Sequence, residues 1–197
     1  LGFLVFIHEG GHFLIAKLCK IKVNEFAIGF GPVIWKKQGK ETKYELRLIP
    51  LGGFVNMEGE AEQSEKEGSF TKASIPRRIA IVAAGALVNI IFAIIVYFIL
   101  AMTVRGDLTN AVVGNRVLDA DNFGNRLYFA SYNTKEFMLS IAESVKQLFT
   151  GKVSSAELVG PVGISEVVAK TNGFREFIYI LSAISISLGV TNLLPFP

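Results

Sequence analysis

Two histidines and a glutamate lie within one apolar stretch near the start of the chain, LVFIHEGGHFLIAKL. His8 and His12 are four residues apart, and Glu9 directly follows the first of them. On a helix this spacing puts both imidazoles on one face, where they can bind a single Zn²⁺ ion. Glu9 would then be placed to accept a proton from water that the metal activates, as a general base. The pattern His-Glu-x-x-His therefore predicts a hydrolytic zinc site.

The composition around this site predicts a membrane protein. Of the 197 residues, 51% are hydrophobic and only 19% are charged, and the charges occur in blocks. Residues 79–104 and 177–197 carry no charge, and residues 1–16 are interrupted only by the three site residues. The 79–104 run would extend about 39 Å as a helix, enough for a tilted crossing of a ~30 Å hydrocarbon core. We therefore expect three membrane spans, at residues 1–18, 79–104 and 177–197.

The same three polar residues also have a purely structural interpretation. Histidines are common as satisfied core groups, and a lone match to this pattern is often accidental in a soluble chain. Inside a membrane, however, an unpaired charged side chain costs at least about 2.5–3.5 kcal/mol. Gly10 and Gly11 add about 1 kcal/mol each relative to alanine in a helix. These costs favour a functional metal site over a structural role.

The basic residues indicate the orientation in the membrane. Twelve of the 20 Lys and Arg residues lie between Lys17 and Arg78, which favours a cytoplasmic position for the loop 19–78. Residues 22–57 show short alternating runs bounded by Gly and Pro, typical of two hairpins or a small sheet. The apolar tips of these runs could enter the membrane where protein covers their backbone. The metal would then lie roughly 7–14 Å below the cytoplasmic surface.

The fold class that we predict is a polytopic α-helical membrane protein, with a three-helix transmembrane core and a small membrane-associated β-hairpin region on the cytoplasmic side. Residues 1–197 would form a single membrane-embedded peptidase domain. Its extracytoplasmic part, 105–176, shows no clear period up to residue 134 and then a helical stripe over 136–149, formed by Met138, Ile141, Val145 and Leu148. We expect the chain to be an internal fragment, since it begins at Leu1 inside an apolar run.

The predicted zinc site lacks one ligand. Hydrolytic zinc normally has three protein ligands and an open position for water. The chain has no further histidine, Cys19 is its only cysteine, and neither of the other apolar runs contains a carboxylate. Two amides, Asn89 and Asn192, lie within those runs, and either could form a hydrogen bond between helices.

Six segments carry a resemblance to a known family: LVFIHEGGHFLIAKL, FAIGFGP, RLIPLGGFVNM, AAGALVNIIFA, LFTGKVSSAELVGPVGIS and ISLGVTNLLPFP. In this order they resemble the site-2 protease family of intramembrane zinc metalloproteases, particularly its bacterial RseP-like and RasP-like members. The glycine-rich pieces are weak signals individually. His-Glu-x-x-His in a membrane span followed by the others in sequence is highly specific, and the matches cover most of the chain.

The resemblance implies the missing ligand. In the family, the pattern Asn-x-x-Pro-x-Pro, here Asn192, Pro195 and Pro197, runs into Leu-Asp-Gly, whose aspartate is the third zinc ligand. That aspartate would lie beyond the end of this chain. The resemblance also suggests that Asn192 orients the substrate or stabilises the oxyanion, and that Pro195 loosens the backbone near the metal. Two departures are a 105–134 segment too short for the PDZ domain of many members, and Ala86 where a proline is common.

By this resemblance, the protein is a zinc-dependent endopeptidase of the bacterial inner membrane, multi-pass, with its active site near the cytoplasmic side. Its partners would be the lipid bilayer and membrane-protein substrates with a single transmembrane segment, such as anti-sigma factors or remnant signal peptides. Nothing indicates a nucleic-acid partner. Two alternatives remain open, a non-catalytic zinc-binding membrane scaffold and a metal transporter, although the inverted repeats typical of transporters are not evident.

Overall fold

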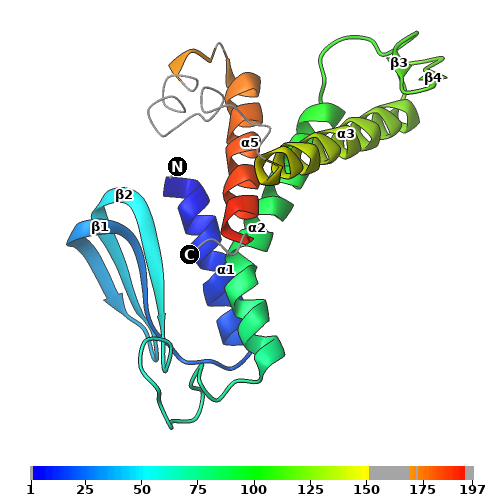
Figure 1. The fold of residues 1–197 in the computed structure, drawn as a ribbon. Helices are drawn as coiled ribbons and strands as arrows, with labels where there is room; N and C mark the ends of the chain where they lie inside the picture. Colours follow the sequence, from blue (N-terminus) through cyan, green and yellow to red (C-terminus); the bar gives the residue numbers. More distant parts are fainter. Residues whose placement is uncertain (1, 151–168, 172, 194–197) are drawn as a thin grey trace. The chain divides into compact units, whose positions relative to one another are not determined.

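The computed structural model describes residues 2–150, 169–171 and 173–193. Its elements, coloured along the chain in Figure 1, are α1 (Gly2–Leu18), β1 (Val23–Gln38), β2 (Lys43–Met57), α2 (Ile75–Met102), β3 (Val112–Val113), β4 (Arg116–Val117), α3 (Phe123–Phe149) and α5 (Phe174–Leu193). The chain divides into two compact units, Leu1–Ile90 with Leu188–Pro197, and Ile91–Ser187. Each unit is described by itself below.

The first unit contains α1, the sheet and the beginning of α2. At Gly11 the two helices approach so closely that a Cβ atom would lie 2.8 Å from the carbonyl oxygen of Ala84. Ala16, Val23 and Ile81 are fully buried in the core that α1, β1 and α2 share. Gly11 therefore allows α1 and α2 to pack backbone against backbone.

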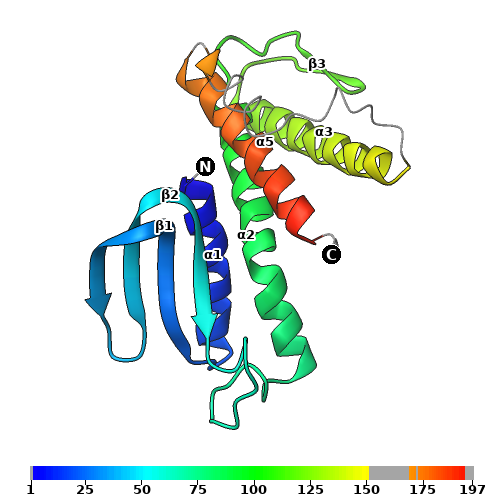
Figure 2. The same cartoon turned by 60° about the vertical axis from the view of Figure 1, so that its left-hand side comes forward.

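The sheet is formed by the two antiparallel strands β1 and β2. Each strand is bent into two segments, and segments of β1 alternate with segments of β2 across the sheet. Phe26 pairs with Tyr44 on one side and with Val55 on the other, and Trp35 pairs with Leu46. Its order from edge to edge is therefore 53–57, 23–28, 43–47 and 33–38 (Figure 2). The prediction of a small sheet over 22–57 is confirmed. The apolar tips are exposed, with Phe30, Ile34, Trp35, Leu48, Ile49 and Leu51 all at least 46% accessible.

Two helices, Ile75–Met102 and Phe174–Leu193, are long and apolar enough to cross a membrane. They correspond to the spans predicted at 79–104 and 177–197, with boundaries displaced toward the N-terminus by two to four residues. The first predicted span forms the 17-residue helix α1. Pro76 stands at the second position of α2, where its missing N–H disturbs no intrahelical hydrogen bond.

In the second unit, α3 corrects the prediction for the segment 105–149. The helix begins at Phe123, not at 136. Among the described side chains of α3, Asn125, Ala130, Thr134 and Phe137 are buried, whereas Met138 of the predicted stripe is 43% exposed. The reason is tertiary: the ring of Phe137 stacks on that of Tyr97 of α2, with 4.1 Å between centroids, and this contact selects the buried face.

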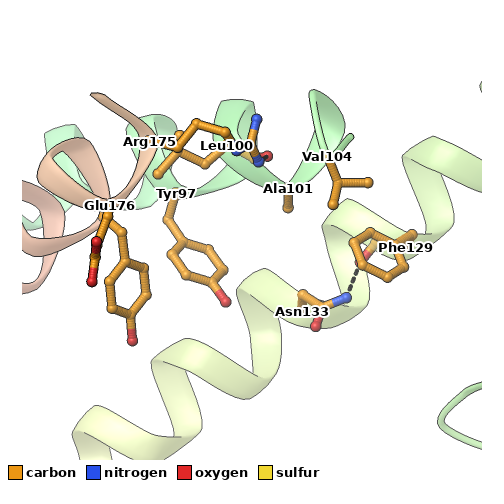
Figure 3. A pocket seen from close by; sticks show the side chains of 9 residues that line it. Tyr97, Leu100, Ala101, Val104, Phe129, Asn133, Arg175 and Glu176 are labelled. Atoms are coloured by element: carbon orange, nitrogen blue, oxygen red, sulfur yellow. Dashed lines mark hydrogen bonds between the residues drawn. The ribbon is translucent and has the colours of Figure 1, made fainter. Parts of the chain in front are cut away.

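The C-terminal end of α2 is capped within this second unit. The guanidinium of Arg175 donates to the carbonyl oxygens of Leu100 and Thr103, at 2.7 and 2.6 Å. A cation at this position satisfies terminal carbonyls and complements the helix dipole. Arg175 also lines a cavity of about 330 Å³ with Tyr97 and Asn133 (Figure 3), where the Asn133 amide donates to the carbonyl of Phe129.

Candidate metal centre

The structure brings the two predicted zinc ligands together on one face of α1. Nε2 of His8 and Nε2 of His12 lie 3.2 Å apart, and the ring centroids are 4.9 Å apart. The helical register explains this convergence, because residues four apart are neighbours on a helix surface. Both side chains are partly buried against α2.

The other ring nitrogen of each histidine is held by α2. Nδ1–H of His12 donates to the carbonyl oxygen of Ile81 at 2.7 Å, which leaves Nε2 with its lone pair free to bind a metal. Nδ1 of His8 lies 3.3 Å from the amide nitrogen of the fully buried Asn89. With the side-chain amide of Asn89 rotated by 180°, its oxygen would accept a hydrogen bond from Nδ1–H of His8. The lone pair of Nε2 of His8 would then be free to bind a metal, as in His12. Contacts of this kind orient metal-binding histidines in known sites.

Gly85 of α2 leaves open the space in front of the two histidines. A Cβ atom at this position would lie 2.4 Å from Nε2 of His12 and 2.8 Å from Nε2 of His8. Any side chain at residue 85 would therefore occupy the region into which both nitrogens point. The sequence AAGALVN thus supplies the gap at Gly85 and, one turn later, the amide of Asn89.

The geometry of the two nitrogens fits zinc. Tetrahedral zinc with Zn–N bonds of 2.0–2.1 Å places two nitrogen ligands about 3.3 Å apart, close to the 3.2 Å observed. Neutral imidazole is also a preferred zinc ligand. Among the residues that the structure describes, no group of three or more His, Cys, Asp or Glu side chains could hold a metal ion. The described residues therefore provide two positions of a zinc site and not the third.

Glu9 lies beside the edge of the sheet. A Cβ atom at Gly53 of β2 would approach Cγ of Glu9 to 3.0 Å and Cγ1 of Val5 to 3.6 Å. β2 runs beside α1 (Figure 2), and its Gly53 approaches the residue predicted to act as a base. The chain folds this way locally because Gly52 and Gly53 carry no side chain, and Gly52 has a φ of +117°.

Asn192 also reaches this region, because its amide nitrogen lies 3.5 Å from Nε2 of His8. Pro195 and Pro197 lie outside the described residues. The sequence predicted a hydrogen bond between helices for Asn89, and the structure identifies His8 as its partner. The roles of Gly85 and of the Ile81 carbonyl were not predicted. The spacing of Gly85 and Asn89 by one helical turn was the available signal.

Comparison with known proteins agrees with this geometry. The model of Peptidase family M50 matches residues 1–197. A candidate zinc metalloprotease of Clostridium acetobutylicum is 30% identical over 272 aligned positions, which cover 100% of this chain and 80% of the relative. The relative therefore carries additional residues within the aligned region. Protease RseP of Yersinia pestis is 30% identical over 188 positions, covering 90% of this chain and 41% of that protein.

The regulator of sigma-E protease RseP of Escherichia coli is 41% identical over 104 positions, covering 50% of this chain and 23% of that protein. The family match covers the whole chain, and relatives are named zinc metalloproteases. Together they show that the chain is a metalloprotease with Zn²⁺ as its cofactor. The apolar helices α2 and α5 agree with a location in the membrane. The chain belongs to peptidase family M50, the site-2 proteases, and is a zinc metalloprotease of the membrane.

Proposed function

We propose that this chain carries out zinc-dependent intramembrane proteolysis, with His8 and His12 as zinc ligands and Glu9 as the general base. The observation that carries the proposal is the convergence of the two Nε2 atoms, 3.2 Å apart, on the space left by Gly85. The third ligand is proposed to be the aspartate that the family resemblance implies beyond Pro197.

The protein groups have distinct roles in this mechanism. Zinc, when bound, polarises the scissile carbonyl and makes water acidic enough to attack at neutral pH. Glu9 takes the proton of the attacking water and later gives it to the leaving amine. Ile81 and Asn89 would keep the imidazoles of His12 and His8 oriented. The role proposed for Asn192 is to hold the substrate backbone or the developing oxyanion, and its position 3.5 Å from Nε2 of His8 supports it.

A transmembrane substrate must unwind before it can be cut, because its amides are engaged within its own helix. An exposed edge of the sheet could hold the unwound segment as an added strand. Residues 43–47 have no free edge, because they are paired on both sides. In the described part of the chain, no strand pairs with the outer side of 53–57, and this segment begins beside Glu9. We assign substrate capture to 53–57.

The wider arrangement follows from the same proposal. The three helices α1, α2 and α5 would form one membrane-embedded peptidase domain in the bacterial inner membrane, with the sheet and the metal on the cytoplasmic side. Its substrates would be proteins with a single transmembrane segment, such as anti-sigma factors or remnant signal peptides. The name of the Escherichia coli relative, a regulator of sigma-E protease, supports the first of these classes.

The test uses the full-length protein in detergent or liposomes, with Glu9→Gln beside the unaltered chain. Zinc content and cleavage of a model transmembrane substrate are measured on the same samples. We expect both proteins to retain zinc and only the unaltered one to cleave. Zinc binding without cleavage by either, across several substrates, would instead favour the scaffold, and zinc flux across liposomes would favour the transporter.

A further inference from the structure

We propose that a pocket at the junction of α1 and α2 binds the phosphate group of an anionic phospholipid. The pocket has a volume of about 400 Å³ and lies where α1 has ended and α2 is about to begin. Its charged lining residues are Lys20, Lys72, Arg77 and Glu67. We call it the basic pocket. It is separate from His8, Glu9 and His12, none of which lines it.

Lys20 is held in the basic pocket in a conformation that favours glycine. The end of α1 is a Schellman motif, in which the N–H of Ile21 donates to the carbonyl of Ala16 and the N–H of Lys20 to that of Lys17. The residue at the position of Lys20 must be left-handed, and its φ is +61°. Glycine is the usual residue there, and a lysine costs about 1 kcal/mol more. The chain therefore has an unfavourable backbone conformation at Lys20, a cation that lines the pocket.

Arg77 is also placed against a local preference. It lies in the first turn of α2, which contains no acidic residue. Cations are unfavourable near a helix N-terminus, because the helix dipole is positive at that end. Within the described residues, neither the Arg77 nor the Lys20 side chain has a hydrogen bond or an ion pair to another protein group. Two cations from different segments thus line one pocket, and among the described residues neither forms an ion pair with a carboxylate.

The remaining charges of the basic pocket do not compensate these two. Lys72 forms an ion pair with Glu65, with 3.1 Å between Nζ and Oε2. Glu67 is the one carboxylate among the lining residues, and it faces three cations. The loop that carries it is fixed to the end of α1, because the N–H of Lys22 donates to the carbonyl of Gly68 at 2.8 Å. The pocket therefore has a loop held by a backbone hydrogen bond, a net positive charge, and space for an external anion.

The position of the basic pocket identifies the anion as a lipid group. α2 is long and apolar enough to span a membrane, and the pocket lies at the N-terminal end of this helix. Leu18, next in sequence to the lining residue Cys19, is 69% exposed and offers an apolar surface to an acyl chain. Basic pockets between helices at the cytoplasmic face are typical sites for anionic lipid headgroups. A phosphatidylglycerol-like lipid satisfies both parts of the surface.

The full-length protein would be reconstituted in nanodiscs of phosphatidylcholine containing a small share of phosphatidylglycerol, and bound lipid would be identified by native mass spectrometry. Lys20→Gly is the sharpest variant, because it removes a charge while relieving the left-handed strain, so the fold is retained. Arg77→Gln is the second variant. Lys36→Gln is the matched control, because it removes one exposed charge from β1 at a residue that does not line the pocket.

We expect retained phosphatidylglycerol to fall about fivefold for Lys20→Gly and for Arg77→Gln, as for one lost cation near a membrane surface. Lys36→Gln should retain as much as the unaltered protein. Equal retention by all four proteins, or equal loss from the Lys36 control, would overturn the proposal. Competition by soluble glycerol phosphate or inorganic phosphate as effective as that of the lipid would also overturn it, because the site would then be one for a free anion.

Discussion

His12 of α1 donates from Nδ1 to the backbone carbonyl of Ile81 in α2 at 2.7 Å. A carbonyl oxygen can only accept, so this contact determines the tautomer of the imidazole and directs the lone pair of Nε2 outward. Because the acceptor is a backbone atom, no side-chain change at Ile81 removes it. One helix thus carries the metal-binding group, and the other sets its chemical state.

Gly85→Ala should weaken zinc binding without unfolding the protein. The added methyl group would lie 2.4 Å from Nε2 of His12, and the ring, which is the mobile end of a side chain, must move away. Alanine also favours helix by about 1 kcal/mol over glycine, so α2 itself should not weaken. We expect zinc affinity to fall by about tenfold or more. Zinc content after dialysis against a weak chelator measures it.

Gly10→Ala is the control for that experiment. A Cβ atom at Gly10 meets nothing within 4 Å, although this residue lies between the two histidines. Its zinc content should equal that of the unaltered protein. Full zinc retention by Gly85→Ala would show that the space in front of the imidazoles is not needed for the metal.

Gly11→Ala should destabilise the protein, in contrast to its neighbour. Its Cβ atom would lie 2.8 Å from the Ala84 carbonyl oxygen and 3.0 Å from Cα of Gly85, and these backbone atoms cannot move without separating α1 from α2. We expect a loss of about 1–3 kcal/mol, typical of overpacking. Thermal unfolding in detergent, with Gly10→Ala as reference, tests this. Equal midpoints for the two variants would contradict close helix packing.

Substitutions of Asn89 and Asn192, the two amides near His8, should separate zinc binding from catalysis. Asn89→Leu keeps the volume but removes the contact to Nδ1 of His8, and we expect zinc affinity to fall about 10–100-fold. Asn192→Leu should retain zinc and lose cleavage, because Asn192 is proposed to act on the substrate. Titration of apoprotein with zinc, beside a cleavage assay, compares them. Equal zinc affinities for both variants would contradict the role of Asn89.

Glu45 should make the sheet sensitive to acid. Hydrogen bonds from Lys43 and Arg47 lower the pKa of its carboxyl from 4.5 to about 2. A lowered folded-state pKa stabilises the protein above the unfolded value of 4.5, and this contribution is lost as the pH falls toward 2. Glu45→Gln should therefore lower the unfolding temperature at neutral pH and change it less at about pH 3. Parallel curves for both proteins across this range would disprove the assignment.

Much of the framework could be predicted from the sequence, because it rests on long, uniform patterns. Uncharged runs located α2 and α5 to within a few residues, and the spacing of His8 and His12 placed them on one face. These signals are local in the chain. The predicted proximity of His8 and His12 is confirmed for the same reason, since residues four apart on a helix must be neighbours.

The parts that were missed depend on contacts distant in sequence. The segment 123–135 lacks an apolar period, and it is helical in a setting where Asn125 bonds to Asp119 and Arg126 donates to the carbonyl of Val104. The alternating halves of β1 and β2 require bends that no residue pattern specifies. The partner of His8 lies 81 residues away, at Asn89.

The contact between His12 and Ile81 also has a consequence for biogenesis. During synthesis α1 leaves the ribosome before α2 has been translated, so neither imidazole then has its partner on the second helix. Metal capture is therefore expected to be a late event, after residue 89 has left the ribosome and the two helices have met. A nascent chain that has formed only its first helix carries the motif but lacks the contacts of His12 and His8 to Ile81 and Asn89.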